Sequence, residues 1–321
     1  MQTTNHLLMI RPVRFGYNAQ TAVNNAFQVA GQDQQQVQQQ AVVEFDDFVS
    51  KLRAAGVQVT VVQDTEEPHT PDSIFPNNWV SFHADGTVVL YPMFAENRRL
   101  ERKPAVLEAV AARFNMERTI DLSYHEANFR MERTIDLSYH EANHLFMAGT
   151  GSMVLDRDKR IAYACLSPRT DHGVLLEFCT QLGYQAEVFT AVDEQLQPIY
   201  HTNVMMCVAD RYVVICLDSI TNHIEQNRVV KTIEGSGKKV IPISWAQMNH
   251  FAGNMLQVHN AEGQPLLVMS SQAYRALTPD QVALLESFNP IVHSSLDTIE
   301  ANGGGSARCM MAEVHLPLKT A

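Results

Sequence analysis

The sequence has no long apolar run and no block of basic residues. No stretch approaches the roughly 20 apolar residues that a membrane helix needs. The first residues, MQTTNHLLMIRPVRFG, contain an apolar run of only four residues and no small-residue cleavage site, so we expect no targeting segment. The net charge is −11, from 35 acidic and 24 basic residues. Nucleic-acid binders need a basic surface, so we expect neither a nucleic acid nor a membrane as partner.

The cysteines form no CxxC pair, and no Cys/His spacing suggests zinc. Their number is odd, and their spacing is irregular: Cys165, Cys179, Cys207, Cys216 and Cys309. We therefore expect free thiols, no bound metal and a cytoplasmic setting.

The chain also lacks a Pro/Gly-rich linker that would divide it. Its 321 residues, 45% of them apolar, are enough for one large globular core. We expect a single domain over residues 1–321, and the sequence leaves homo-oligomerisation open.

Short β-rich runs recur along the chain, and helical patterns fill several of the gaps between them. The predicted strands cover residues 7–10, 57–62, 87–91, 152–155, 161–164, 212–216, 239–243, 253–258, 265–269 and 308–315. The predicted helices cover residues 34–56, 104–114, 173–182, 220–235 and 278–288. The last helix opens with TPDQ, a Thr cap followed by Pro. Strand pairs that alternate with single helices predict an α/β fold.

A tandem duplication interrupts this pattern. Residues 114–128 read FNMERTIDLSYHEAN and residues 129–143 read FRMERTIDLSYHEAN, so the two units differ only at Asn115 and Arg130. Two copies are too few for a solenoid. Since one TIDLS segment can fill a given place in a sheet, we expect the other copy to lie outside it.

The C-terminal stretch ANGGGSARCMMAEVH places Cys309 directly behind three glycines and a serine. Glycines let a loop approach a ligand closely. We expect the cysteine at a loop-to-strand junction that faces a pocket, where Arg308 or a histidine lowers the pKa of the thiol. The alternative is a small buried cysteine without chemistry.

Three other stretches contain polar residues beside apolar ones. In PIYHTNVMMC, His201 and Asn203 would point to the same side of an extended segment, and an imidazole beside a thiol is the pair used in covalent catalysis. FPNNWV carries Asn77 and Asn78. In MNHFAGNMLQV, Asn254 is a polar residue among apolar ones. Ordinary Asx-rich turns would explain the last two stretches equally well.

Taken in order, these four stretches resemble the guanidine-modifying superfamily, which includes arginine deiminases, dimethylarginine hydrolases, amidinotransferases, succinylarginine dihydrolase and citrulline hydrolases. The resemblance runs from LMIRPVRFGYNAQTAVNNAFQ to the cysteine motif GGGSARCM and is closest to the citrulline hydrolases. It implies a five-bladed α/β propeller, or pentein, of ββαβ units around a central active-site pocket. It also implies a place in arginine metabolism and no cofactor.

By position, the resemblance makes Cys309 the nucleophile and His201 the general acid and base. Asn78 and Asn203 fall where arginine deiminases have the two aspartates that bind the guanidinium cation. A neutral ureido group needs only hydrogen-bond donors and acceptors, which Asn supplies, so a ureido substrate such as citrulline is favoured over arginine. Asn254 and Arg308 complete the predicted substrate-binding set.

The implied reaction is hydrolysis of a C–N bond through a covalent cysteine intermediate, with citrulline giving ornithine, ammonia and carbon dioxide. The alternatives are an amidinotransferase or an arginine deiminase-like enzyme. A papain-like hydrolase is disfavoured, because there the cysteine precedes the histidine in the chain.

One position departs from the family pattern. The family carries a Glu before its Gly-Thr-Gly-Ser stretch, and here Ala148 takes that place. That Glu orients the histidine, and only the displaced Glu141 or Glu126 of the two duplicated copies could replace it. A catalytically impaired, ligand-binding member of the family is therefore a further reading.

Overall fold

The protein is described from a computed structural model, which covers residues 1–25, 27–28, 33–116 and 134–319. Within these residues the strands form five sheets of three strands each. In strand order, the sheets are β15 (Ala312–Glu313), β1 (His6–Arg11) and β2 (Gln58–Gln63); β3 (Val80–Phe82), β4 (Val88–Leu90) and β5 (Thr134–Asp136); β6 (Val154–Asp156), β7 (Ile161–Cys165) and β8 (Gln185–Phe189); β9 (Met206–Val208), β10 (Tyr212–Ile215) and β11 (Lys239–Pro242); and β12 (Leu256–His259), β13 (Pro265–Ser270) and β14 (Ile291–Ser294).

Every sheet repeats one pairing pattern. The middle strand pairs antiparallel with one neighbour and parallel with the other, as β10 does with β9 and β11. A helix joins the two parallel strands, because parallel neighbours need a crossover connection. The first sheet differs only in its antiparallel strand, β15, which comes from the C-terminal end of the chain and pairs Leu7 with Glu313.

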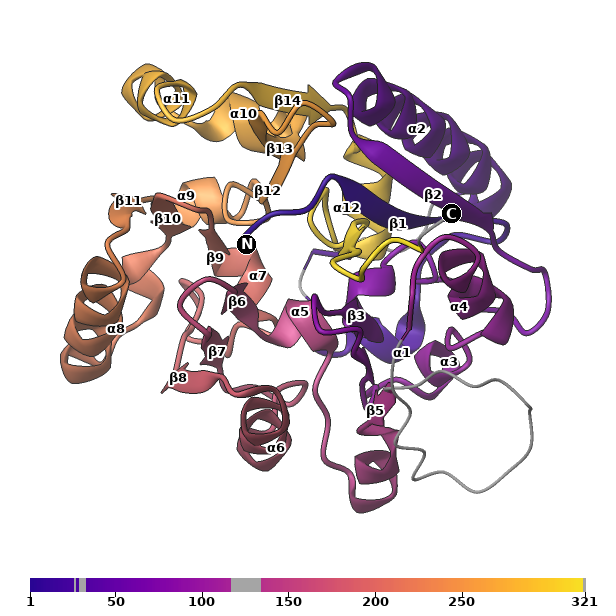
Figure 1. The fold of residues 1–321 in the computed structure, drawn as a ribbon, viewed down its shortest axis with the longest axis horizontal. Coiled ribbons are helices and arrows are strands. Elements are labelled where there is room, and N and C mark those ends of the chain that lie inside the picture. Colours follow the sequence, from indigo (N-terminus) through magenta and orange to yellow (C-terminus); the bar gives the residue numbers. More distant parts are fainter. Residues whose placement is uncertain (26, 29–32, 117–133, 320–321) are drawn as a thin grey trace.

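The crossover helices and several shorter helices fill the rest of the described chain. The α-helices are α1 (Ala19–Ala22), α2 (Gln34–Ala54), α3 (Glu96–Arg99), α4 (Pro104–Ala111), α5 (Gly149–Ser152), α6 (His172–Leu182), α7 (Thr202–Met205), α8 (His223–Gly235), α9 (Trp245–Met248), α10 (Ser271–Ala276), α11 (Pro279–Glu286) and α12 (Asp297–Gly303), with 3₁₀ turns at Pro76–Asn78, Ser138–Asn143 and Leu217–Ser219. Figure 1 shows α2, α6, α8 and α11 on the outside of the molecule and the short helices α5, α7 and α12 toward its middle. None of the helices in the described ranges is long and apolar enough to cross a membrane.

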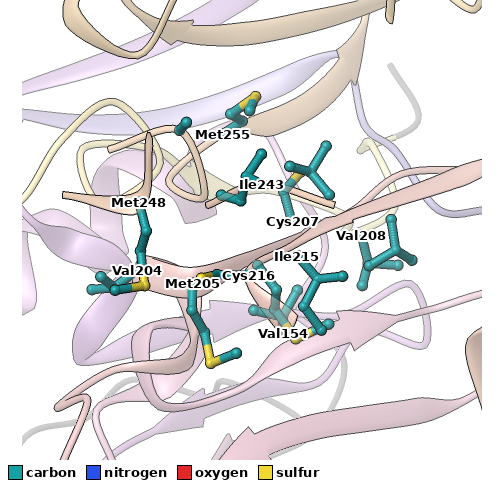
Figure 2. Close-up of a cluster of buried hydrophobic side chains, with 14 of the residues drawn as sticks. Val154, Val204, Met205, Cys207, Val208, Ile215, Cys216, Ile243, Met248 and Met255 are labelled. Atoms are coloured by element: carbon teal, nitrogen blue, oxygen red, sulfur yellow. The ribbon is translucent and has the colours of Figure 1, made fainter. Parts of the chain in front are cut away.

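The largest apolar cluster fixes the position of α7. Val204 and Met205 of α7 pack with Ile215 of β10 and with Ile243 and Met248 (Figure 2). Thioether side chains suit such a cluster, because they are flexible enough to fill irregular gaps. His201 and Asn203, which precede these two residues, are buried as well.

The predicted α/β class is confirmed, and all five predicted helices are present. The Thr278 cap is also correct, since its side chain accepts a hydrogen bond from the Gln281 N–H in a capping box. The predicted strand over residues 308–315 is wrong in extent, because only Ala312–Glu313 pairs in a sheet. Within the described residues the structure shows five three-stranded sheets. The five-bladed propeller is a finer statement that these sheets alone do not confirm, and it stays a prediction.

The second copy of the duplication forms the predicted strand. Thr134–Asp136 is β5, which pairs parallel with β4 through Val88 and Thr134. Residues 117–128, which make up most of the first copy, lie outside the described residues.

Candidate active site

The nucleophile candidate Cys309 lies in a turn rather than at the start of a strand. Helix α12 ends at Gly304, which adopts a left-handed conformation with φ of 64° that favours glycine. The chain then turns, and the Cys309 N–H donates to the Ser306 carbonyl at 3.0 Å. Only 5% of the Cys309 surface is exposed, so the thiol is held inside the protein.

Two amide side chains face the sulfur. Asn203 Nδ2 lies 3.4 Å from Cys309 Sγ, and Asn254 Nδ2 lies 3.3 Å from it. The structure therefore brings together three of the residues singled out in the sequence, which come from α7, the turn before β12 and the turn after α12. All three are buried.

His201 precedes α7 directly, and its imidazole has no hydrogen-bond partner at Nε2 among the described residues. The expectation of an extended 201–203 segment is wrong, because Thr202–Met205 is a short helix, although His201 itself has extended backbone angles. Burial lowers the pKa of His201 well below 6.5, and the cations Arg169 and Arg98 lower it further. The imidazole is therefore neutral near pH 7 and able to accept a proton.

No carboxylate in the described part of the chain orients His201. Ala148 is buried against the apolar cluster that contains Trp79, and its N–H donates to Ser152 Oγ at 2.7 Å. Glu141 is committed elsewhere, since its carboxylate accepts from Arg102 at 2.7 Å and from the Met93 N–H. Glu126 lies outside the described residues.

Asn78 faces the same space as His201. A Cβ atom built at Gly151 would lie 2.4 Å from Asn78 Nδ2 and 2.9 Å from His201 Nδ1, so both side chains lie against this one glycine. Asn78 Oδ1 accepts a hydrogen bond from Arg98 Nη1 at 2.7 Å, whereas Asn78 Nδ2 is buried and has no partner. Because a guanidinium can only donate, Arg98 fixes the amide with its NH₂ group turned away toward Gly151 and His201.

Arg308 directs its charge away from Cys309. Its Nη2 donates to Glu313 Oε2 at 2.7 Å and its Nη1 to the Met311 carbonyl at 2.8 Å. Burial alone would raise the pKa of Glu313, but Arg157 and Arg308 outweigh burial and hold it below its ordinary value. A substrate-binding role for Arg308 stays a prediction, and in the structure its guanidinium has a partner within the chain.

Three charged residues at the site were missed from the sequence: Arg98, Arg169 and Asp72. Arg98 lies on α3 and is neutralised by Glu101, whose Oε1 is 2.9 Å from Arg98 Nε, and by Asp72 at 3.8 Å. The only local signal was an acidic residue six positions before Asn78 in DSIFPNN. Nothing in the sequence distinguished the two arginines from surface arginines.

Arg169 is a buried cation without a carboxylate partner in the described ranges. Its Nε donates to Asn24 Oδ1 at 2.8 Å, its Nη2 donates to the Thr21 carbonyl at 2.6 Å, and its guanidinium lies 5.1 Å from the Tyr200 ring. Burial lowers the pKa of Arg169 to about 10, so the group keeps its charge at neutral pH. Asp72 is near enough to offset part of this lowering, but no ion pair to Arg169 is formed in the described ranges. A buried cation without an ion-pair partner is costly.

Asp72 supplies the opposite charge nearby. Its Oδ2 accepts from Asn18 Nδ2 at 2.8 Å and from Thr21 Oγ1 at 3.1 Å, but its Oδ1 is buried and without a partner. Among the residues the structure describes, no group of three or more His, Cys, Asp or Glu side chains is arranged to hold a metal ion.

The described part of this α/β protein thus places a buried thiol between two amide donors, with a neutral histidine two residues before one of these amides, Asn203. The family model described as "N,N dimethylarginine dimethylhydrolase, eukaryotic" matches residues 11–316, and the chain belongs to this family. It is thereby a member of the guanidine-modifying superfamily. No protein of curated function matches the chain.

Solved structures with similar folds include cyanobacterial ArgZ, an arginine dihydrolase from the ornithine–ammonia cycle. Its apo form has a TM-score of 0.71 at 17% identity and covers 98% of this chain and 41% of its own. The substrate-bound N-terminal domain of ArgZ gives 0.72 at 18% identity, covering 97% and 98%. A dimethylarginine dimethylaminohydrolase variant with S-methyl-L-thiocitrulline gives 0.63 at 12%, covering 97% and 99%. At these identities the likeness concerns the fold, and the chain spans about two fifths of full-length ArgZ.

Proposed function

We propose that this protein is a cysteine-dependent hydrolase that cleaves a C–N bond of a ureido or guanidino amino acid, with citrulline as the substrate. Cys309 is the nucleophile and His201 the general acid and base. Family membership supports the hydrolase class, and dimethylarginine and arginine, named for members and neighbours, are the competing substrates.

The observation that supports a ureido substrate is the orientation of Asn78. Arg98 occupies Asn78 Oδ1, so Asn78 offers only N–H donors to a ligand beside His201. A guanidinium group carries donors on all its nitrogens and would face donor against donor. A ureido oxygen accepts hydrogen bonds, so it is the better partner for Asn78 Nδ2.

Two charged groups support an amino acid as the substrate. Arg169 would bind the α-carboxylate, because it is a buried cation without an anionic partner in the described chain. Asp72 would bind the α-ammonium group through Oδ1, which has no partner. Charge-assisted hydrogen bonds of this kind are about twice as strong as neutral ones and fix the orientation of the ligand.

In the proposed reaction, the Cys309 proton passes to His201 and the thiolate attacks the ureido carbon of citrulline. The bond from that carbon to its terminal nitrogen breaks, and His201 returns the proton to the leaving ammonia. Water, deprotonated by His201, then cleaves the S-carbamoyl (thiocarbamate) intermediate, and the departing sulfur takes up the proton, which restores the thiol. The released carbamic acid of ornithine loses carbon dioxide, so citrulline and water give ornithine, ammonia and carbon dioxide.

A second candidate function is favoured by the missing carboxylate at His201. With Ala148 in place of the family glutamate, the imidazole has no orienting partner in the described chain. A protein that binds the same amino acid and turns it over extremely slowly would have this site.

The deciding experiment measures ammonia and ornithine from citrulline, arginine and dimethylarginine, with Cys309→Ser as the control. We expect citrulline to be hydrolysed, the product to be absent in Cys309→Ser, and mass spectrometry to find an adduct on Cys309. Faster turnover of arginine than of citrulline would contradict the ureido preference. Tight citrulline binding without adduct or product would support the second candidate, and an acceptor amine that collects an amidino group from arginine would indicate an amidinotransferase.

For the architecture, we propose that the five sheets are the blades of one closed propeller in a single domain over residues 1–321. Pairing of β15 with β1 supports this, because strands from the two ends of the chain complete one sheet. The site residues come from segments that follow four different sheets, which fits a central pocket.

A further inference from the structure

The turn before β12 has a strained backbone. Phe251 follows α9 with a φ of 62°, a left-handed conformation that is rare for a bulky residue. Its ring packs on Phe27 with ring centroids 4.9 Å apart. Such strain persists only where the surroundings hold it, and it concentrates at functional sites.

The same turn is pressed directly against α7. A Cβ atom built at Gly253 would lie 2.3 Å from the Val204 carbonyl oxygen, so only glycine allows this approach. The next residue, Asn254, closes the turn, since its N–H donates to the Phe251 carbonyl at 2.8 Å. The strained turn and the close contact together deliver the Asn254 side chain to the site.

The Asn254 amide joins the segments that carry the site residues. Its Nδ2 donates to Cys309 Sγ at 3.3 Å and to the Asn203 carbonyl at 3.0 Å, and its Oδ1 accepts the Arg308 N–H at 3.0 Å. A backbone N–H can only donate, so Oδ1 must face Arg308 and the NH₂ group must face the sulfur. Asn254 is 1% exposed, which leaves no room for water to take over these bonds.

The sulfur therefore receives N–H groups from two sides, from Asn254 and from Asn203. Two N–H donors stabilise a negatively charged thiolate more than they stabilise a neutral thiol. The cation next in sequence, Arg308, is not available for this purpose, because its guanidinium is bound to Glu313.

We propose that Asn254 is a catalytic residue that stabilises the Cys309 thiolate and fixes its direction of attack, with Asn203 as the second donor. The S–H proton leaves to His201, whose Nε2 has no other partner among the described residues, and the electron pair that remains on sulfur accepts the two N–H groups. The inference rests on the proposed function only in taking Cys309 as the nucleophile.

The test is alkylation of Cys309 by iodoacetamide, followed by mass spectrometry of the labelled peptide between pH 6 and 10. This readout needs no substrate, so it stands apart from the proposed hydrolysis. In Asn254→Asp, one carboxylate oxygen still accepts the Arg308 N–H, but the other faces the sulfur and repels a thiolate. We expect alkylation at pH 7 to be about tenfold slower, recovering as the pH rises.

Asn289→Asp is the matched control. Asn289 is similarly buried but bonds to Tyr212 and Gln257 instead of the cysteine. The rate of Cys309 alkylation in this variant should therefore equal that in the unaltered protein. If Asn254→Asp does not fold, as judged by its Tm, Asn203→Asp tests the second donor with the same expected direction. A folded variant at either position with an unchanged rate at pH 7 would overturn the proposal, whatever the outcome with citrulline.

Discussion

The two halves of the candidate active site differ in how their polar atoms are satisfied. On the nucleophile side, Cys309 contacts Asn203 and Asn254. The Asn254 amide has both ends bonded, whereas Asn203 Oδ1 has no partner among the described residues. On the acid–base side, His201 Nε2 and Asn78 Nδ2 are buried and have no partner in the described chain. Buried polar groups are usually hydrogen-bonded, so these two atoms are available to a ligand group as far as the described residues show.

The thiol side is therefore held in place by the protein before a ligand binds, whereas the side chains around His201 would gain further hydrogen-bond partners only when a ligand binds. In the proposed reaction, the unpartnered atoms around His201 would face the reacting group, whereas the Asn254 amide, bonded at both ends, would hold the thiol in place. Position 148 is connected to the acid–base half through α5, because Ala148 is the N-cap residue of this helix and Gly151 of the same helix lies against His201.

The largest expected effect comes from giving His201 a carboxylate. We expect Ala148→Glu to raise kcat for citrulline by about 10²-fold or more, since positioned proton transfer contributes rate factors of this size. Ala148→Gln has the same size without the charge and is the control. An equal kcat in the Glu and Gln variants would show that position 148 does not serve His201.

Removal of the uncompensated cation should have the next largest effect. We expect Arg169→Gln to lower kcat/KM for citrulline by about 10²-fold, mostly through KM, because a buried partner of the α-carboxylate is lost. Arg169→Lys keeps the charge and should lose less. Carbamoylputrescine, a ureido compound without a carboxylate, should be hydrolysed equally well by all three proteins, and a comparable loss with it would refute carboxylate binding.

A smaller effect, on substrate preference, is expected when the hydrogen-bond donor of Asn78 is replaced by an acceptor. In Asn78→Asp, one oxygen keeps the bond from Arg98 and the other turns an acceptor toward the ligand. We expect the ratio of kcat/KM for arginine to that for citrulline to rise about tenfold or more. Asn77→Asp, which places the same charge on the neighbouring buried residue, should leave the ratio unchanged.

The smallest expected effect is on the pH dependence of kcat/KM, which reports the protonation of His201. Burial, and then Arg169 and Arg98, lower the pKa of His201 well below 6.5, so the imidazole stays neutral as the pH falls through that value. We expect kcat/KM for citrulline to remain level at pH 6.5 and to decline only at lower pH, where His201 gains a proton. In Ala148→Glu, the decline should move to higher pH, because a nearby carboxylate favours the imidazolium. A decline centred at or above pH 6.5 in the unaltered protein would contradict a neutral, buried His201.

Local patterns in the sequence predicted much of the secondary structure but missed several strands. Helix α11 was predictable because the Thr278 cap and Pro279 act within one turn. Strands β3, β8, β9 and β14 were missed, because runs of three to five residues carry little periodicity. The 201–203 segment was predicted as extended, whereas packing of Val204 and Met205 in the apolar cluster accompanies a helix there.

The sequence by itself determined which side chains are candidates for the chemistry: a cysteine behind a glycine run, a histidine, and amides at the positions where arginine deiminases are expected to have acids. The tertiary structure decided how these groups are used. Only the fold revealed that Arg308 turns to Glu313, that Arg98 bonds to Asn78 Oδ1, and that Arg169 forms no ion pair with a described carboxylate. The physical reason is that hydrogen-bond direction and burial depend on neighbours far apart in the chain, such as Asn254 and Cys309, which no local pattern encodes.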